Sequence, residues 1–158
     1  MLDFVDLAGK RKSCRSFSEQ KVEPDAIEKI CHAGTLAPSA WGRKGLQFFI
    51  LQDPRQIAQA SRMICSLKES VQEGSDPIFY SAPAVVLIGL QEQNRHEFSE
   101  FDAGFAVQNC LLQATEMGLH TCVIGFANLL NKDLKMKAEL GLQADWEVFL
   151  AFCVGHAR

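Results

Sequence analysis

One stretch of this sequence, residues 101–117, limits the possible folds more than any other. Its pattern is helical, and its apolar side chains occupy most of the helix circumference: Phe105, Ala106, Val107, Cys110, Leu111, Leu112, Ala114 and Met117. A helix that is apolar on most sides is buried on most sides. A chain of 158 residues has little else to cover such a helix, so we expect a second subunit to cover part of it. The small residues Ala103, Gly104 and Ala106 would let another helix come close.

The rest of the chain alternates between helical and strand patterns. Helices are expected over residues 2–7, 24–36 and 54–69, and a further helix is expected after Asn131, which is placed to cap it. Strands are expected over residues 46–51, 84–90, 119–124 and 146–154. Residues 84–90 form an uninterrupted apolar run, which is typical of a strand covered on both faces. Because no repeat or linker interrupts the pattern, the sequence predicts a single domain over residues 1–158.

Positive charge is concentrated in residues 10–17, which read Lys-Arg-Lys-Ser-Cys-Arg-Ser-Phe. The formal net charge of the chain is −3, and outside this stretch 12 basic residues face 19 acidic ones. Guanidinium groups bind phosphate oxygens bidentately, and a serine hydroxyl adds a neutral donor, so the stretch suits a phosphate monoester. A solvated basic turn is the alternative interpretation. The acidic balance disfavours nucleic-acid binding, including RNA binding, which depends on a broadly positive surface.

Several other classes of site are disfavoured. The six cysteines are widely spaced with no C-x-x-C pair, and the four histidines lack metal-ligand spacing, so we expect no metal site and a cytoplasmic protein with reduced thiols. No secretion signal or membrane-spanning run is expected either. Cys14 lies among basic residues, as reactive cysteines do. A catalytic role is nevertheless disfavoured, because no histidine or acid lies near Cys14 in the sequence.

Four segments, in order, resemble the nitroreductase family of FMN-dependent oxidoreductases. The family's opening R-R/H-S-x-R/K-x-F reads here as residues 11–17, and its A-P-S-A/S-x-N-x-Q-P-W loop reads as residues 37–46. Its D-A-G-x-A-x-Q-N segment reads as residues 102–109, and G-L followed by I-G reads as residues 118–119 and 124–125. The resemblance covers residues 5–156. It implies an α+β fold with a central mixed β-sheet flanked by helices, and a long buried helix at a homodimer interface.

The resemblance also implies how a cofactor would be held. Arg11, Lys12 and Ser13 would bind the FMN phosphate, and Arg15 would reach the pyrimidine side of the flavin ring. The backbone at Gly125, after Ile124, would donate a hydrogen bond to flavin N5. From the other subunit, Pro38, Ser39 and Ala40 would pack on the ring. NAD(P)H would reduce the flavin, leave, and be replaced by a nitroaromatic, quinone or similar small-molecule acceptor, which is a ping-pong scheme. The flavin carries this chemistry, so no catalytic side chain is expected.

This chain departs from the family pattern in two places. Gly42 and Lys44 stand where the family has Asn and Gln, so the contact to the ribityl chain of FMN is lost or passes to Lys44. The chain also stops at Arg158, where family members continue with cationic residues that contact the phosphate. We therefore expect weaker flavin binding than is usual, with Arg158 as a substitute cation. A low-turnover flavin-binding store or sensor is the alternative function, and a flavin-cleaving or dehalogenating branch is a third.

Overall fold

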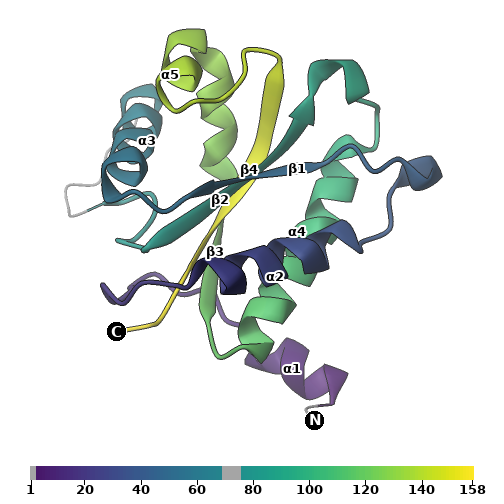
Figure 1. Cartoon of the computed structure of the whole chain (residues 1–158), viewed down its shortest axis with the longest axis vertical. Coiled ribbons are helices and arrows are strands. Elements are labelled where there is room, and N and C mark those ends of the chain that lie inside the picture. Colours follow the sequence, from purple (N-terminus) through teal and green to yellow (C-terminus); the bar gives the residue numbers. More distant parts are fainter. Residues whose placement is uncertain (1–2, 69–75) are drawn as a thin grey trace.

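The computed structural model describes residues 3–68 and 76–158, and its centre is a four-stranded sheet (Figure 1). The strands are β1 (Gln47–Leu51), β2 (Ala84–Gln91), β3 (His120–Ile124) and β4 (Trp146–Gly155), in the order β1-β2-β4-β3. All three neighbouring pairs are antiparallel. The one parallel pairing in the described ranges is a single bridge between Ser13 and Thr121. The expected α+β class is confirmed, but the four-stranded sheet is antiparallel instead of mixed, and the parallel bridge lies outside its strands.

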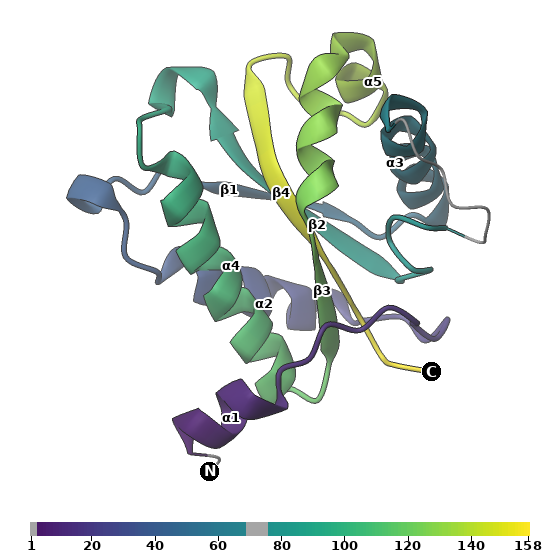
Figure 2. The same cartoon turned by 180° about the vertical axis from the view of Figure 1, so that it is seen from behind.

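Helices cover both faces of the sheet. On one face lie α2 (Pro24–Thr35) and α4 (Ser99–Glu116), and on the other lie α3 (Pro54–Leu67), α5 (Leu134–Glu139) and the 3₁₀ segment η3 (Gly125–Lys132) (Figures 1 and 2). The short α1 (Phe4–Lys10) packs beside α4, and two 3₁₀ turns, η1 (Ala40–Gly42) and η2 (Glu92–Asn94), lie in loops. No helix in the described part of the chain is long and apolar enough to cross a membrane.

The central strand β2 divides the core into two clusters. Val85 and Leu87 pack against the α3 and η3 side, whereas Ala84, Val86 and Ile88 pack against the α2 and α4 side. Successive side chains of a strand point to opposite faces, so a strand between two helical layers must be apolar at every position. The prediction of a strand covered on both faces over residues 84–90 is confirmed.

Two predicted elements differ from the structure. The first helix covers Phe4–Lys10 instead of residues 2–7, and it buries none of its residues; residues 1 and 2 lie outside the described ranges. The helix expected after Asn131 is capped by Asp133, whose carboxylate accepts the backbone N–H groups of Lys135 and Met136. Asn131 instead pairs with the backbone of Val148, donating at 2.7 Å and accepting at 2.8 Å. The Asn131 cap was wrong because an Asx side chain two residues later starts the helix.

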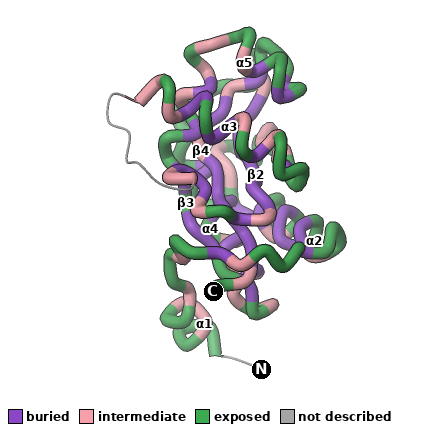
Figure 3. The backbone as a smooth tube through the Cα atoms, turned by 90° about the vertical axis from the view of Figure 1, so that its left-hand side faces the viewer, coloured by how far each residue is buried: buried purple, intermediate pink, exposed green. Residues whose placement is uncertain are grey.

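Helix α4 confirms the long apolar helix that was predicted over residues 101–117. Its inner face buries Ala103, Ala106, Val107, Cys110, Leu111 and Ala114 against the sheet and α2. The close approach between helices occurs at Gly34 of α2, where a Cβ atom would lie 2.6 Å from the sulfur of Cys110. The outer face leaves Phe101 65% and Phe105 52% exposed. Figure 3 shows buried backbone in the sheet and the inner helix faces, and exposed backbone at α1.

Candidate functional site

The basic stretch lies along the edge of β3. The parallel bridge pairs Ser13 with Thr121, and the backbone N–H of Cys14 donates to the carbonyl oxygen of Thr121 at 2.8 Å. Phe17 is completely buried, and a second bridge pairs it with Ala157. These backbone contacts fix the stretch, while the side chains of its polar residues remain free to meet a ligand. Lys12, Ser13 and Arg15 are exposed, and Arg11 is half-buried.

Arg15 and Gly125 share one cavity of about 430 Å³. Gly125 follows the last residue of β3, Ile124, which also lines the cavity. A Cβ atom on Gly125 would meet nothing within 4 Å, so a flat ligand can approach this backbone closely. On the cavity wall, the ammonium group of Lys68 lies 4.1 Å from the ring centroid of Phe126, which is a cation–π contact. We call this cavity the flavin-side pocket.

The second group of predicted residues lies in the loop after α2. The buried carboxylate of Asp102, in the first turn of α4, accepts the backbone N–H of Ala40 at 3.0 and 3.2 Å. His96 accepts the N–H of Phe98 on Nδ1 at 3.3 Å, which leaves Nε2 to donate toward Asp102 at 3.4 Å. A side chain from a distant helix therefore sets the conformation of this loop.

Aromatic contacts hold the tip of the same loop. Trp41 has a positive φ of 53°, a conformation that L-residues rarely adopt. Its ring lies 5.5 Å from the ring of His96 and 5.5 Å from the ring of Phe98, and the guanidinium of Arg43 stacks on it at 5.0 Å. Phe98 in turn contacts Phe101. We call Trp41, Phe98, Phe101 and Phe105 the aromatic face.

The polar side chains of this loop are less available to a ligand than the sequence suggested. The ammonium group of Lys44 donates to the carbonyl oxygen of Thr35 at 2.9 Å. The hydroxyl of Ser39 is buried and has no hydrogen-bond partner. Pro38, Ser39 and Lys44 line a cavity of about 120 Å³. Gly42 is exposed at a φ of +68°. The loop therefore presents mainly its backbone and the aromatic ring of Trp41.

A single chain does not bring the two groups together. The loop with η1 and the stretch of residues 11–17 lie on opposite sides of α4 in both views (Figures 1 and 2). Arg11–Ser13 and the flavin-side pocket are therefore one half of the predicted site, and Pro38–Lys44 are the other. This separation is what a site shared between two subunits requires.

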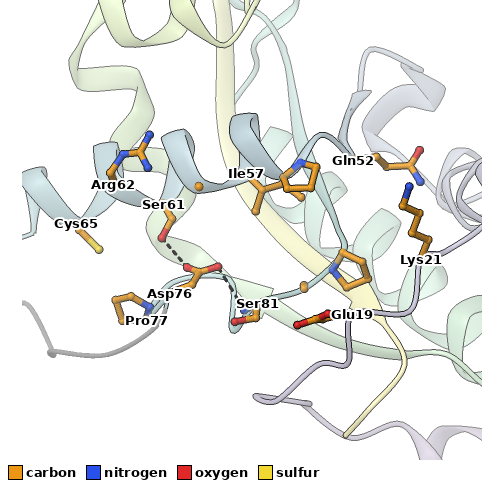
Figure 4. Close-up of a pocket in the computed structure, with 14 residues that line it drawn as sticks. Glu19, Lys21, Gln52, Ile57, Ser61, Arg62, Cys65, Asp76, Pro77 and Ser81 are labelled. Carbon is orange, nitrogen blue, oxygen red and sulfur yellow. Dashed lines mark hydrogen bonds between the residues drawn. The ribbon is translucent and has the colours of Figure 1, made fainter.

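A larger cavity lies elsewhere. It has a volume of about 770 Å³ and is bounded by α3, the turn 76–83 and residues Glu19 and Lys21 (Figure 4). One of its two carboxylates, that of Asp76, already accepts the hydroxyl of Ser61 at 2.6 Å and the N–H groups of Phe79 and Ser81. None of the sequence-predicted residues lines it, so we prefer the smaller flavin-side pocket as the candidate site.

Sequence reasoning missed several residues of the two half-sites. Lys68 and Phe126 reach the flavin-side pocket from segments that are far apart in the sequence, and no local pattern marks Lys68. Asp102 opens the quoted D-A-G segment, which was the available signal, but its contact with Ala40 is between residues 62 positions apart. Within the described ranges no group of three or more His, Cys, Asp or Glu side chains could hold a metal ion.

Comparison with known proteins matches nearly the whole chain. The profile of the nitroreductase family matches residues 8–156. An Archaeoglobus fulgidus protein named "Putative NADH dehydrogenase/NAD(P)H nitroreductase" is 23% identical over 150 residues, which are 94% of this chain and 82% of that protein. A Bacteroides fragilis nitroreductase solved with bound FMN has a TM-score of 0.87 at 19% identity, covering 100% of this chain and 90% of its own. A Desulfitobacterium hafniense nitroreductase, also with bound FMN, has a TM-score of 0.85 at 19% identity, covering 100% and 91%.

Proposed function

Because this chain belongs to the nitroreductase family of flavin-dependent oxidoreductases, we propose that it binds FMN between the two subunits of a homodimer. We further propose that it transfers hydride from NAD(P)H to a nitroaromatic, quinone or similar acceptor. The observation that carries the proposal is the flavin-side pocket, in which Arg15 and the open backbone of Gly125 face one cavity.

The residues around this pocket fit FMN. When bound, the flavin would supply hydride transfer at N5, which no side chain of the chain can supply. The flavin ring needs open space beside a backbone N–H donor, which Gly125 offers. It also needs cations near its carbonyl oxygens, which Arg15 and Lys68 provide. The phosphate needs exposed cations and hydroxyls, which Arg11, Lys12 and Ser13 provide at the edge of β3.

We propose that each side chain positions the cofactor and that none transfers a proton. Arg11 and Ser13 would hold the phosphate by charge-assisted and neutral hydrogen bonds. Arg15 would hold the pyrimidine edge of the ring, and the N–H of Gly125 would orient N5 toward the reacting face. Phe126 would exclude water from one side of the pocket.

The homodimer is proposed because the two half-sites cannot meet within one chain. The aromatic face leaves Trp41 and Phe101 both 65% exposed, next to the loop that would cover the partner's flavin. Large exposed aromatic patches mark interaction sites in soluble proteins. Pro38 and Ala40 would then pack on the flavin, and the loop would contact it through its backbone because the Ser39 hydroxyl points inward.

A store or sensor of flavin is the second candidate, and one observation favours it. The amide side chains that the family uses at positions 42 and 44 are absent here, and Lys44 is bonded to Thr35. We propose a cytoplasmic location for either function, where six free cysteines stay reduced.

A visible spectrum of freshly purified protein, followed by anaerobic titration with NADH and NADPH, tests the proposal. A reductase should show flavin bands, bleach with the donor, and turn over with a nitroaromatic or quinone. A store should bleach at most once. Protein that neither retains added FMN nor shows flavin bands would refute both candidates.

A further inference from the structure

Three thiols lie side by side across the edge of the sheet. In the antiparallel register of β3 and β4, Cys122 faces Cys153. On the other side of β3, an isolated parallel bridge pairs Ser13 with Thr121, and the backbone N–H of Cys14 donates to the carbonyl oxygen of Thr121 at 2.8 Å, which places Cys14 beside Cys122 at this edge. All three cysteines pack in the core cluster between the sheet and α3. We call Cys14, Cys122 and Cys153 the thiol row.

The spacing of Cys14 and Cys122 suits a disulfide. Neighbouring strands lie about 4.8 Å apart, and a disulfide needs its two Cα atoms about 4.4–6.8 Å apart. The N–H of Cys14 bonds to the residue before Cys122, so Cys14 lies at about this strand spacing, which is within the Cα range of a disulfide. Cys122 belongs to the core cluster between the sheet and α3, and Cys14 packs against the same cluster, so the two side chains lie on one face of the sheet.

The members of the thiol row differ in exposure. Cys153 is completely buried, Cys122 is 4% exposed, and Cys14 is half-buried at the sheet edge. Desolvation raises the pKa of the Cys122 thiol, with an opposing effect from the charge of Arg15, and desolvation raises the pKa of Cys153 well above its ordinary value. Burial therefore keeps the two inner thiols protonated at neutral pH and out of reach of a dissolved oxidant, although Cys122 still lies next to Cys14. An oxidant from solution meets Cys14 first.

We propose that Cys14 and Cys122 form an oxidant-sensitive pair that closes to a disulfide in the presence of a peroxide. The Cys14 sulfur breaks the O–O bond of hydrogen peroxide, takes one oxygen as a sulfenic acid and releases water. The Cys122 sulfur then displaces that oxygen as a second water and forms the S–S bond. The two thiols lose two electrons, and their protons leave in the two waters.

This disulfide would change how the basic stretch is held. Cys14 lies between Ser13 and Arg15, and the reduced stretch meets β3 through a single bridge. A covalent link at this point would keep Arg15 at the mouth of the flavin-side pocket. The inference depends on the position of Cys14 beside β3 and does not require that the protein binds flavin.

The test treats the intact, reduced protein with hydrogen peroxide and counts free thiols after denaturation. We expect two of the six cysteines to disappear, the mass to fall by two hydrogen atoms, and a peptide linking Cys14 to Cys122 to appear. Dithiothreitol should restore both thiols. Conversion of Cys14 to sulfinic acid without a linked peptide would overturn the proposal.

Variants separate this pair from the other thiols. Cys14→Ser changes a half-buried edge residue and should abolish the linked peptide, as should Cys122→Ala. Cys65→Ser is the matched control, because Cys65 is also half-buried but lies on α3 outside the thiol row; it should leave the disulfide intact. If the Cys122→Ala variant does not fold, the Cys14→Ser variant alone still tests the proposal. A Cys122–Cys153 link that forms without Cys14 would overturn the assignment.

Discussion

The two half-sites are built in opposite ways. The stretch of residues 11–17 is fixed through its backbone, by the bridges to Thr121 and Ala157, and leaves charged side chains exposed. The loop of residues 38–44 is fixed through side chains, by the Asp102 carboxylate and the rings around Trp41, and its Ser39 hydroxyl is buried. The first half-site would therefore bind a ligand through charged side chains, and the second through the shape of its backbone and aromatic rings. Substitutions in the two half-sites should have different effects.

The largest effect is expected from Phe101→Glu, which places a charge at the centre of the aromatic face. Interface hot spots contribute about 2 kcal/mol or more, so self-association should weaken at least about 30-fold and the flavin site should be lost with it. Sedimentation equilibrium measures the association. Leu134→Glu on α5 is the matched control, since Leu134 is 62% exposed on the other face of the sheet. Equal weakening by both variants would contradict the proposed interface.

Arg11→Ala should remove charge from the first half-site without disturbing its backbone. A hydrogen bond to a charged group contributes about 1.5–3 kcal/mol, so the dissociation constant for FMN should rise about 10- to 150-fold. Fluorescence titration of flavin-free protein measures it. The control is Arg55→Ala, an exposed arginine in the first turn of α3. Retention of FMN by Arg11→Ala after dialysis would show that the basic stretch does not bind the phosphate.

Asp102→Ala tests the second half-site by removing the contact that sets its shape. It leaves the N–H of Ala40 and Nε2 of His96 without their partner, at a cost of about 1–3 kcal/mol. Because a protein of this size loses about 2–4 °C per kcal/mol, the melting temperature of the flavin-free protein should fall by roughly 5 °C. Glu100→Ala, which removes an exposed acid two residues away in the same turn, should lower it much less. Calorimetry with an unchanged melting temperature for Asp102→Ala would refute the role of this carboxylate.

Gly125→Ala should give the smallest change in stability and so separates folding from binding. The added methyl group meets nothing within 4 Å, and exposed substitutions of this kind change the unfolding free energy by about 0.5 kcal/mol or less. Flavin affinity should nevertheless fall, because the methyl group occupies the space through which the ring approaches. Urea unfolding and FMN titration of the same preparation give the two values. Unchanged FMN affinity would place the ring elsewhere.

The sequence carried enough information for most of the fold, whereas the site residues that it predicts remain a proposal. Apolar periodicity reflects burial directly, so β2 and α4 were predicted with nearly correct bounds. Asn131 and Asp133 are chemically similar and two residues apart, and only the tertiary pairing of Asn131 with Val148 decides between them. Contacts such as those of Asp102 with Ala40, or of Lys68 with Phe126, join distant segments and have no local pattern.

The pairing of Ser13 with Thr121 also has a consequence for how the protein is made. Residues 11–17 leave the ribosome early, but the strand that fixes them is synthesised about a hundred residues later, and their second contact, through Ala157, later still. Non-local pairing of this kind forms slowly, and nascent chains fold as their partners emerge. During translation, the arginines of the basic stretch should therefore remain on a free segment until the β3 region has been synthesised. A ribosome-bound chain ending before residue 120 should capture no flavin.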